Sequence, residues 1–147
     1  MPMKCIADVN VLLPLLCEGH PFQHAAYAWL ETKEPMSVGW CLPVRLAILR
    51  HLSNERIMGS GLLSPENALS AWQQLSSDER LFEVVTVPVS LESHLRVNVA
   101  GRQPSPKLWT DAWLAALAES MTCEMVTCDR GFRNFRLSQL RIIEAAA

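Results

Sequence analysis

The sequence predicts an α/β fold in which a central parallel β-sheet is flanked by helices, and three observations lead to this expectation. Short apolar runs alternate with longer amphipathic stretches, and strands that are separated by helices usually form parallel sheets. Half of the 147 residues are hydrophobic and 19% are charged, which favours a single folded domain, residues 1–147. Two apolar runs also end at or next to an aspartate, as expected at the carboxyl edge of such a sheet.

The amino-terminal half is predicted to contain two strands and four helices. Apolar residues recur at helical spacing in its longer segments, and Ser64 followed by Pro65 supplies an N-cap and a proline at the first helical position. Pro14 lacks an N–H and is expected to weaken the first turn of its helix. The expected elements are strand Lys4–Ala7, helix Asn10–Cys17, helix His20–Thr32, a strand near Met36–Val38, helix Leu42–Leu52 and, after a break at Gly59–Gly61, helix Ser64–Ser77.

The carboxyl-terminal half is predicted to contain three strands and two long helices. Its first strand is rich in β-branched residues, and Ser90 is expected to cap the helix that follows. The expected elements are strand Leu81–Val87, helix Leu91–Ala100, a polar loop Gly101–Leu108, helix Thr110–Ala118, strand Glu124–Thr127, a turn or short helix at Phe132–Phe135 and strand Arg141–Ile143.

Composition excludes several classes of protein. No apolar run approaches the roughly 20 residues of a membrane span, and Asp8 comes too early for a secretory signal, so a cytoplasmic location without membrane attachment is expected. The five cysteines are odd in number and show no C-x-x-C spacing, which favours reduced thiols over disulfides or zinc. The net charge of −2 gives no bulk basicity of the kind that marks many nucleic-acid-binding proteins.

Three aspartates are candidate metal ligands. Asp8 ends the apolar run Cys5–Ala7, Asp111 opens a helical stretch, and Asp129 closes the run Met125–Cys128. If they converge at one edge, their carboxylates suit a hard divalent cation such as Mg²⁺ or Mn²⁺. The alternatives are local: turn residues at Asp8 and Asp129, and a favourable charge near a helix N-terminus at Asp111.

Five segments of the chain, in order, resemble those of one protein family. Asp8–Leu13 is similar to the opening motif of PIN-domain ribonucleases, Thr110–Ala118 to their third acidic motif, and Thr127–Phe132 to their terminal T-x-D-x-x-F. His20–Ala26 and Ile48–Asn54 resemble the connecting segments of VapC-type toxins from bacterial toxin–antitoxin pairs. Each motif alone has low specificity, but the ordered set spans nearly the whole chain.

The resemblance implies a PIN-like three-layer fold and a metal-dependent endonuclease that hydrolyses RNA to 5′-phosphate and 3′-hydroxyl ends. It also implies Mg²⁺ or Mn²⁺ as cofactor, an RNA substrate, a homodimer and a cognate antitoxin, as in type II toxin–antitoxin systems. The catalytic and metal-binding residues are then Asp8, Asp111 and Asp129, with Asn10 and Thr127 in support. For these two supporting residues the alternatives are a helix cap and an ordinary strand residue.

Four arginines, Arg130, Arg133, Arg136 and Arg141, crowd the chain after Asp129. Such a cluster is most often surface charge, and the alternative is contact with nucleic-acid phosphates. Arg130 and Arg133 are the candidates for RNA contact.

Arg45 departs from the family pattern, because it stands where related chains usually carry a glutamate. No aspartate or glutamate occurs between Glu34 and Glu55, so the acid has not moved to a neighbouring position. A guanidinium near the site would oppose a cation or bind phosphate itself. This leaves open a catalytically weakened PIN-fold module that only binds RNA or antitoxin. A haloacid-dehalogenase-like phosphotransferase is disfavoured, because it needs an aspartate at position 10, which is Asn10.

Overall fold

A computed structural model describes residues 4–145 of the chain and contains one five-stranded parallel sheet. The strand order is β3-β2-β1-β4-β5, so β1 lies at the centre. In register, Cys5 of β1 stands opposite Val38 of β2 and Glu124 of β4. The strands are β1 (Cys5–Ala7), β2 (Val38–Trp40), β3 (Leu81–Glu83), β4 (Glu124–Thr127) and β5 (Leu140–Ile142).

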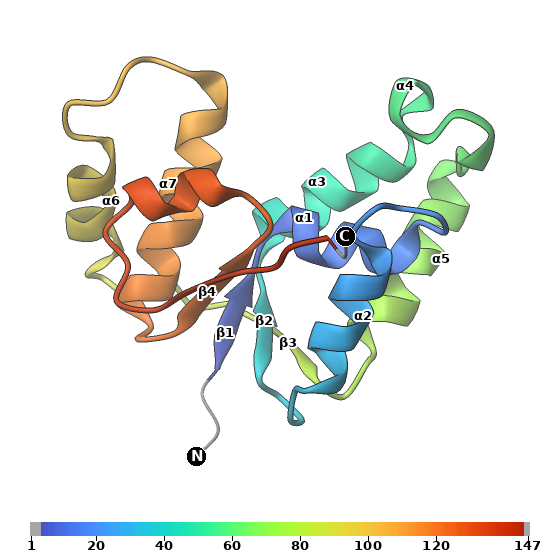
Figure 1. Ribbon diagram of the computed structural model, residues 1–147, viewed down its shortest axis with the longest axis horizontal. Helices are drawn as coiled ribbons and strands as arrows, with labels where there is room; N and C mark the ends of the chain where they lie inside the picture. The colour runs from blue at the N-terminus through green and yellow to red at the C-terminus, as the bar shows by residue number, and fades with distance from the viewer. Residues whose placement is uncertain (1–3, 146–147) are drawn as a thin grey trace.

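Helices cover both faces of this sheet, which confirms the predicted α/β class with its three layers. Figure 1 shows α6 and α7 on one side of the strands and α2, α3 and α5 on the other. The helices are α1 (Val9–Leu12), α2 (Gln23–Glu31), α3 (Leu42–Leu52), α4 (Glu55–Met58), α5 (Pro65–Ser76), α6 (Leu91–Val99) and α7 (Pro106–Ser120), with 3₁₀ turns η1 (Leu13–Leu16), η2 (Gly59–Gly61) and η3 (Arg130–Asn134).

Several elements form where the sequence predicts them. The bounds of α3 and β4 are as expected, and α5 begins after Ser64, whose hydroxyl accepts a hydrogen bond from the N–H of Asn67. The first helix changes to a 3₁₀ turn at Leu13, because Pro14 has no N–H to continue the α-helical ladder.

Other boundaries were wrong. β2 runs two residues later than expected, because Met36 has a positive φ of 56° and belongs to a turn. β3 ends at Glu83 rather than Val87. Ser90 makes no side-chain capping bond, because its own backbone is already helical. The most consequential difference is that α7 begins at Pro106, inside the segment expected to be a loop.

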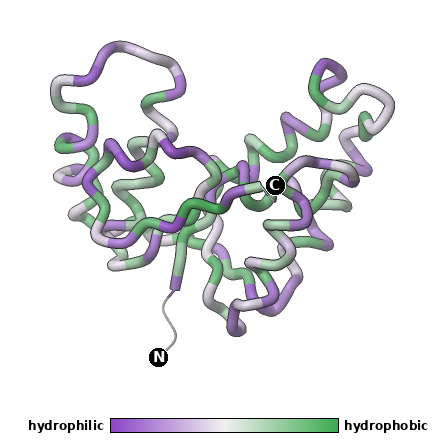
Figure 2. The backbone as a smooth tube through the Cα atoms, in the orientation of Figure 1, coloured by the Kyte–Doolittle hydropathy of each residue, from purple (hydrophilic) through white to green (hydrophobic). Residues whose placement is uncertain are grey.

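The core lies between the sheet and the two helical layers. The strands β1 and β4 are almost fully buried, and α7 contributes buried alanine and leucine side chains at Ala112 and from Leu114 to Ala118. Figure 2 shows the helices alternating between hydrophilic and hydrophobic colours, as expected for elements with one buried face. All five cysteines are free thiols. Within residues 4–145, no helix has the length and hydrophobicity needed to span a membrane.

Candidate active site

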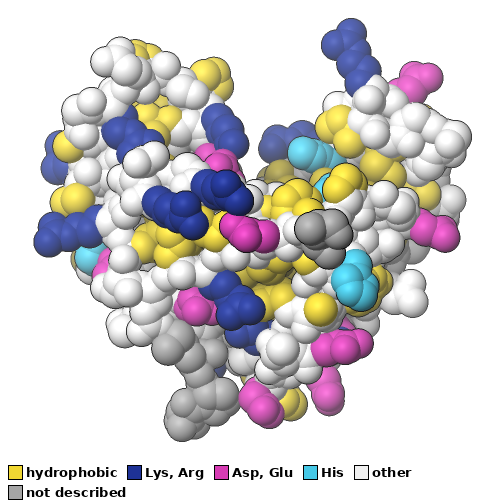
Figure 3. All heavy atoms as spheres, viewed as in Figure 1, with side chains coloured by type: hydrophobic (Ala, Val, Ile, Leu, Met, Phe, Trp, Pro, Cys, Tyr) yellow, Lys and Arg dark blue, Asp and Glu magenta, His cyan; other side chains and the backbone are white. Residues whose placement is uncertain are grey.

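The candidate site lies where the order of the strands reverses. After β1 the chain moves to β2 on one side, and β4 later pairs with β1 on the other, so β1 and β4 flank the switch point. Ligands of open parallel sheets bind at this place, beyond the carboxyl ends of the strands. Asp8 follows β1 directly and Asp129 follows β4 after one residue. The space-filling view is notched above this edge, and acidic and basic side chains border the notch (Figure 3).

Asp8 and Asp129 each use one oxygen for a local hydrogen bond and turn the other toward groups distant in sequence. The N–H of Val9 donates to Oδ1 of Asp8 at 2.7 Å, and the N–H of Gly131 donates to Oδ1 of Asp129 at 2.8 Å. The remaining oxygens contact Thr127 and Lys107 respectively. Both aspartates are therefore turn residues, but the turn accounts for only half of each carboxylate.

The buried hydroxyl of Thr127 links the two sides of the site. It donates to Oδ2 of Asp8 at 2.8 Å and accepts from the N–H of Asp129 at 3.0 Å. The side-chain oxygen of Asn10 lies 3.3 Å from the same hydroxyl and accepts from the N–H of Cys128 at 3.0 Å. Asn10 and Thr127 thus hold the loop after β4 against the start of α1.

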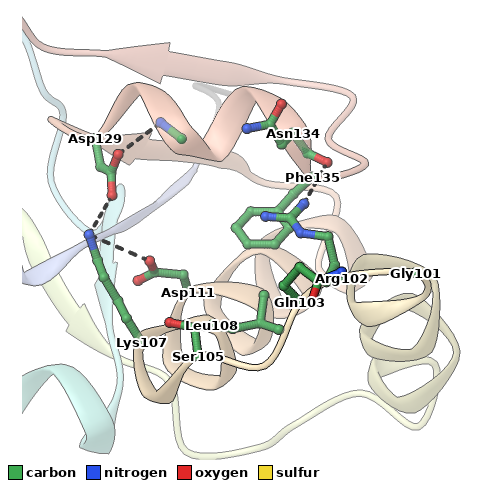
Figure 4. Close-up of a pocket in the computed structure, with 11 residues that line it drawn as sticks. Gly101, Arg102, Gln103, Ser105, Lys107, Leu108, Asp111, Asp129, Asn134 and Phe135 are labelled. Atoms are coloured by element: carbon green, nitrogen blue, oxygen red, sulfur yellow. Dashed lines mark hydrogen bonds and ion pairs between the residues drawn. The ribbon is translucent and has the colours of Figure 1, made fainter.

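Helix α7 supplies the third aspartate. Asp111 was expected in the first turn of its helix, but α7 begins at Pro106, five residues before Asp111. Asp111 therefore lies in the second turn, and a favourable charge at the helix N-terminus does not explain why an aspartate stands there. Lys107 lies one turn before it on the same helix face. Its Nζ is 3.9 Å from Oδ2 of Asp111 and 2.8 Å from Oδ2 of Asp129 (Figure 4).

Burial and mutual repulsion raise the pKa values of two of these carboxyl groups, and the contact with Lys107 lowers that of the third. Burial, reinforced by the charge of Asp8, raises the pKa of Asp111 to about 6. Burial also raises the pKa of Asp8, against the hydrogen bonds from Thr127 and Val9. The ammonium of Lys107, followed by the N–H of Gly131, lowers the pKa of Asp129. The ionised forms of Asp8 and Asp111 are therefore disfavoured, chiefly by burial.

This donor set fits a hydrated divalent cation. Within residues 4–145, no three carboxylate, imidazole or thiol side chains are close enough to enclose an ion directly. Three carboxylates around one shared cation are nevertheless a suitable arrangement for Mg²⁺, which binds through few carboxylates and keeps several waters. Raised carboxyl pKa values also indicate that additional positive charge would stabilise the ionised site.

The three predicted arginines, Arg45, Arg130 and Arg133, are less closely connected to the three aspartates. Among residues 4–145, Arg45 makes no ion pair with any of the three aspartates, and its buried Nε has no hydrogen-bond partner. It lies one turn after Cys41, the residue that precedes α3. Arg130 pairs with Glu144 at 2.9 Å, and both side chains are exposed. Arg133 is exposed on η3.

Lys107 is the residue that sequence reasoning missed. Two signals were present: Ser105 followed by Pro106 is a typical helix start, and a lysine four residues before an aspartate is a typical pair on one helix face. Extending the helix back to Pro106 would have brought Lys107 to the side of Asp111.

Comparison with known proteins points in one direction. Residues 5–137 match the model of the PIN domain. The chain is 32% identical over 142 residues to ribonuclease VapC41 of Mycobacterium tuberculosis, covering 94% of this chain and 97% of the relative. It is 32% identical over 132 residues to ribonuclease VapC44 of the same organism, covering 87% of each. Its fold resembles the crystal structure of VapBC2 from Rickettsia felis bound to a promoter DNA fragment, with a TM-score of 0.69, 16% identity, and coverage of 97% of this chain and 100% of the other.

Proposed function

Because the chain belongs to the PIN-domain family, we propose that it is a metal-dependent ribonuclease, the toxin of a type II toxin–antitoxin pair. One observation carries the proposal: at the topological switch point Asp111 and Asp129 share the ammonium of Lys107, and Asp8, bonded to Thr127 beside them, is close enough for its charge to raise the pKa of Asp111. A chain with this arrangement, similar along most of its length to two proteins named ribonucleases, has the parts for phosphodiester hydrolysis.

The proposed ligands of the cation are Asp8, Asp111 and Asp129. A bound Mg²⁺ or Mn²⁺ would supply a water of lowered pKa and neutralise charge on phosphate oxygens. Asp129 is held by Gly131, and Asp8 by Thr127, so these carboxylates need little rearrangement on binding. The ammonium of Lys107 is exposed on one side and can contact the non-bridging oxygens of an RNA phosphate.

The proposed partners follow from the same family membership. The RNA would enter the notch over the carboxyl edge of the sheet, with Arg130 and Arg133 as contacts beyond Asp129. An antitoxin would cover the site until the toxin is released, and a homodimer is expected. The exposed side chains of Leu42, Leu46 and Trp109 offer apolar surface for such association. Activity on cellular RNA implies a cytoplasmic location.

Arg45 favours a second candidate, a PIN-fold module that binds RNA or antitoxin without cleaving. The family's usual acid would add negative charge near the site, whereas a guanidinium does not ligate a cation. The two candidates differ in metal affinity. A nuclease should bind Mn²⁺ more tightly than the triple variant with asparagine at positions 8, 111 and 129, and a non-cleaving module should not.

The test is cleavage of single-stranded RNA by the purified protein with Mn²⁺, with Mg²⁺ or with a chelator. Asp8→Asn, Asp111→Asn and Asp129→Asn should each lower the rate by about a hundredfold or more, since each removes a charge from the site. Asp78→Asn is the control, because Asp78 pairs with Arg80 away from the site. Cleavage that persists in all three variants, or in the chelator, would refute the proposal.

A further inference from the structure

Beside the three carboxylates lies a hollow of about 500 Å³ that the proposed chemistry does not use. It is bounded by the loop before α7, the first turns of α7 and η3, and it shares Lys107, Asp111 and Asp129 with the site (Figure 4). A second hollow of about 790 Å³ adjoins the opposite side and shares Lys107 and Asp129. Lys107 and Asp129 therefore border both spaces, each of which is within the size range of small-molecule pockets.

Arg102 is fixed at the far end of the first hollow. Its Nη1 donates to the carbonyl of Asn134 at 3.2 Å, and its guanidinium carbon lies 4.8 Å from the ring centre of Phe135. Phe135 is buried, so the guanidinium rests on a rigid aromatic surface. These two contacts connect the loop before α7 to the end of η3 across 32 positions of sequence.

The charge of Arg102 differs from that of Lys107 in one respect. Lys107 is paired with two carboxylates, whereas Arg102 makes no ion pair within the described residues. A guanidinium with one bond to a carbonyl keeps most of its five N–H donors for another partner. Flat guanidinium groups of this kind stack on nucleic-acid bases and bond to their edges.

The remaining walls suit a base better than a second phosphate. Leu108 and Phe135 give apolar surface. The side-chain amides of Gln103 and Asn134 make no hydrogen bond within residues 4–145. Amides at these positions can pair with donor and acceptor groups on a base edge. Apolar walls with a few polar groups are the usual composition of a specific ligand pocket.

We propose that this hollow is a base-specific subsite that takes the nucleotide next to the scissile phosphate of single-stranded RNA. Arg102 stacks on the base, and the amides of Gln103 and Asn134 bond to its edge. The inference rests on the proposed ribonuclease function, because the carboxylate end of the hollow is where the scissile phosphate would lie. It predicts that duplex RNA is a poor substrate, since a paired base cannot enter the hollow without leaving its stack.

The experiment uses a library of 12-nucleotide single-stranded RNAs of random sequence. The wild-type protein cleaves the library with Mn²⁺, and sequencing of the products gives the base preference at every position around the cut. Asn134→Ala and Arg102→Ala should abolish the preference at one flanking position and leave the other positions unchanged. Asn67→Ala and Arg56→Ala are matched controls, because both side chains are exposed on helices that do not line the hollow. They should leave the base preference at every position unchanged.

Binding provides a readout that needs no catalysis. RNA affinity is measured by fluorescence anisotropy with the labelled library in the presence of a chelator. Arg102→Ala should weaken this affinity by about tenfold, which is within the range for the loss of one base-stacking contact. Arg102→Lys should recover part of this affinity through its charge but not the base preference. If the wild-type protein binds without cleaving, the bound RNA is sequenced and the same single-position comparison applies.

The outcomes separate the two proposals. Wild-type protein that neither cleaves nor binds RNA refutes the ribonuclease function and the subsite with it. If the wild type cleaves RNA but the variants only slow the reaction, or change the base preference at several positions at once, the subsite proposal is overturned. The proposed ribonuclease function then still stands.

Discussion

Replacing Lys107 by methionine removes the ammonium shared by Asp111 and Asp129 and keeps an unbranched side chain of similar length. The ammonium contacts the oxygens that the proposed cation would bind, so protein and metal compete for them. Lys107→Met should therefore tighten Mn²⁺ binding. At saturating Mn²⁺ it should also slow RNA cleavage, because positive charge beside the phosphate is lost.

The size of the effect follows from distance and exposure. Two unit charges about 4 Å apart interact by about 1 kcal/mol in water and about 4 kcal/mol at an effective dielectric of 20. The Lys107 side chain is 71% exposed, which places its ion pairs near the lower limit. Exposed pairs contribute about 0.2–1 kcal/mol each, so two of them, about 0.4–2 kcal/mol together, correspond to a change of about two- to thirtyfold in metal affinity.

Calorimetric titration with Mn²⁺ measures this change, and it should be done above the pKa of Asp111 so that proton release does not mask it. Lys4→Met is the control, because Lys4 precedes β1 at the opposite edge of the sheet. The difference between the variants should shrink at high salt, where exposed charges are screened. Unchanged or weaker Mn²⁺ binding in Lys107→Met would refute competition and mark the lysine as a structural tie.

Three further predictions concern the remaining site residues. The pKa of Asp111 is raised from 3.8 to about 6 in the folded state, so its contribution to stability is fully present below about pH 4 and is lost as the pH rises to about 6. In thermal melts without metal, the wild type should therefore lose stability relative to Asp111→Asn between about pH 4 and pH 6. Asp8→Asn should abolish Mn²⁺ binding with little loss of melting temperature, because the hydroxyl of Thr127 can donate to Asn10 instead and accept from the new amide. A melting temperature lower by more than about 8 °C would mark Asp8 as a structural residue. Arg45→Glu should tighten Mn²⁺ binding and raise cleavage, with Arg45→Gln in between, whereas no change in either variant would place Arg45 outside the site.

Local patterns were sufficient to predict the fold class and the strands that lead to Asp8 and Asp129. Apolar runs and cap signals are properties of neighbouring residues, and they located α3, α5 and β4 well. The predicted bounds of β2 were wrong because its middle residue is Gly39, and glycine is uncommon inside strands. Gly39 is required by packing, since a Cβ there would lie 2.8 Å from the ring of Phe82.

The parts of the site that sequence reasoning could not predict depend on long-range contacts. Thr127 meets Asp8 across 119 positions, and Arg102 meets Asn134 across 32. The resemblance indicated Asn10 and Thr127 as supporting residues, but not which groups they would bond. The pKa of Asp111 is raised first by burial and then by the charge of Asp8, and both causes depend on how the folded chain brings distant segments together.

The position of β1 between β2 and β4 has a consequence for synthesis of the chain. Asp8 is synthesised more than a hundred residues before β4, which completes the carboxylate cluster. Until β4 has been synthesised and paired with β1, Asp8 has neither the hydroxyl of Thr127 nor the carboxylate of Asp129 beside it. A chain synthesised only as far as α7 therefore carries no complete carboxylate cluster, which is assembled only once β4 has paired with β1.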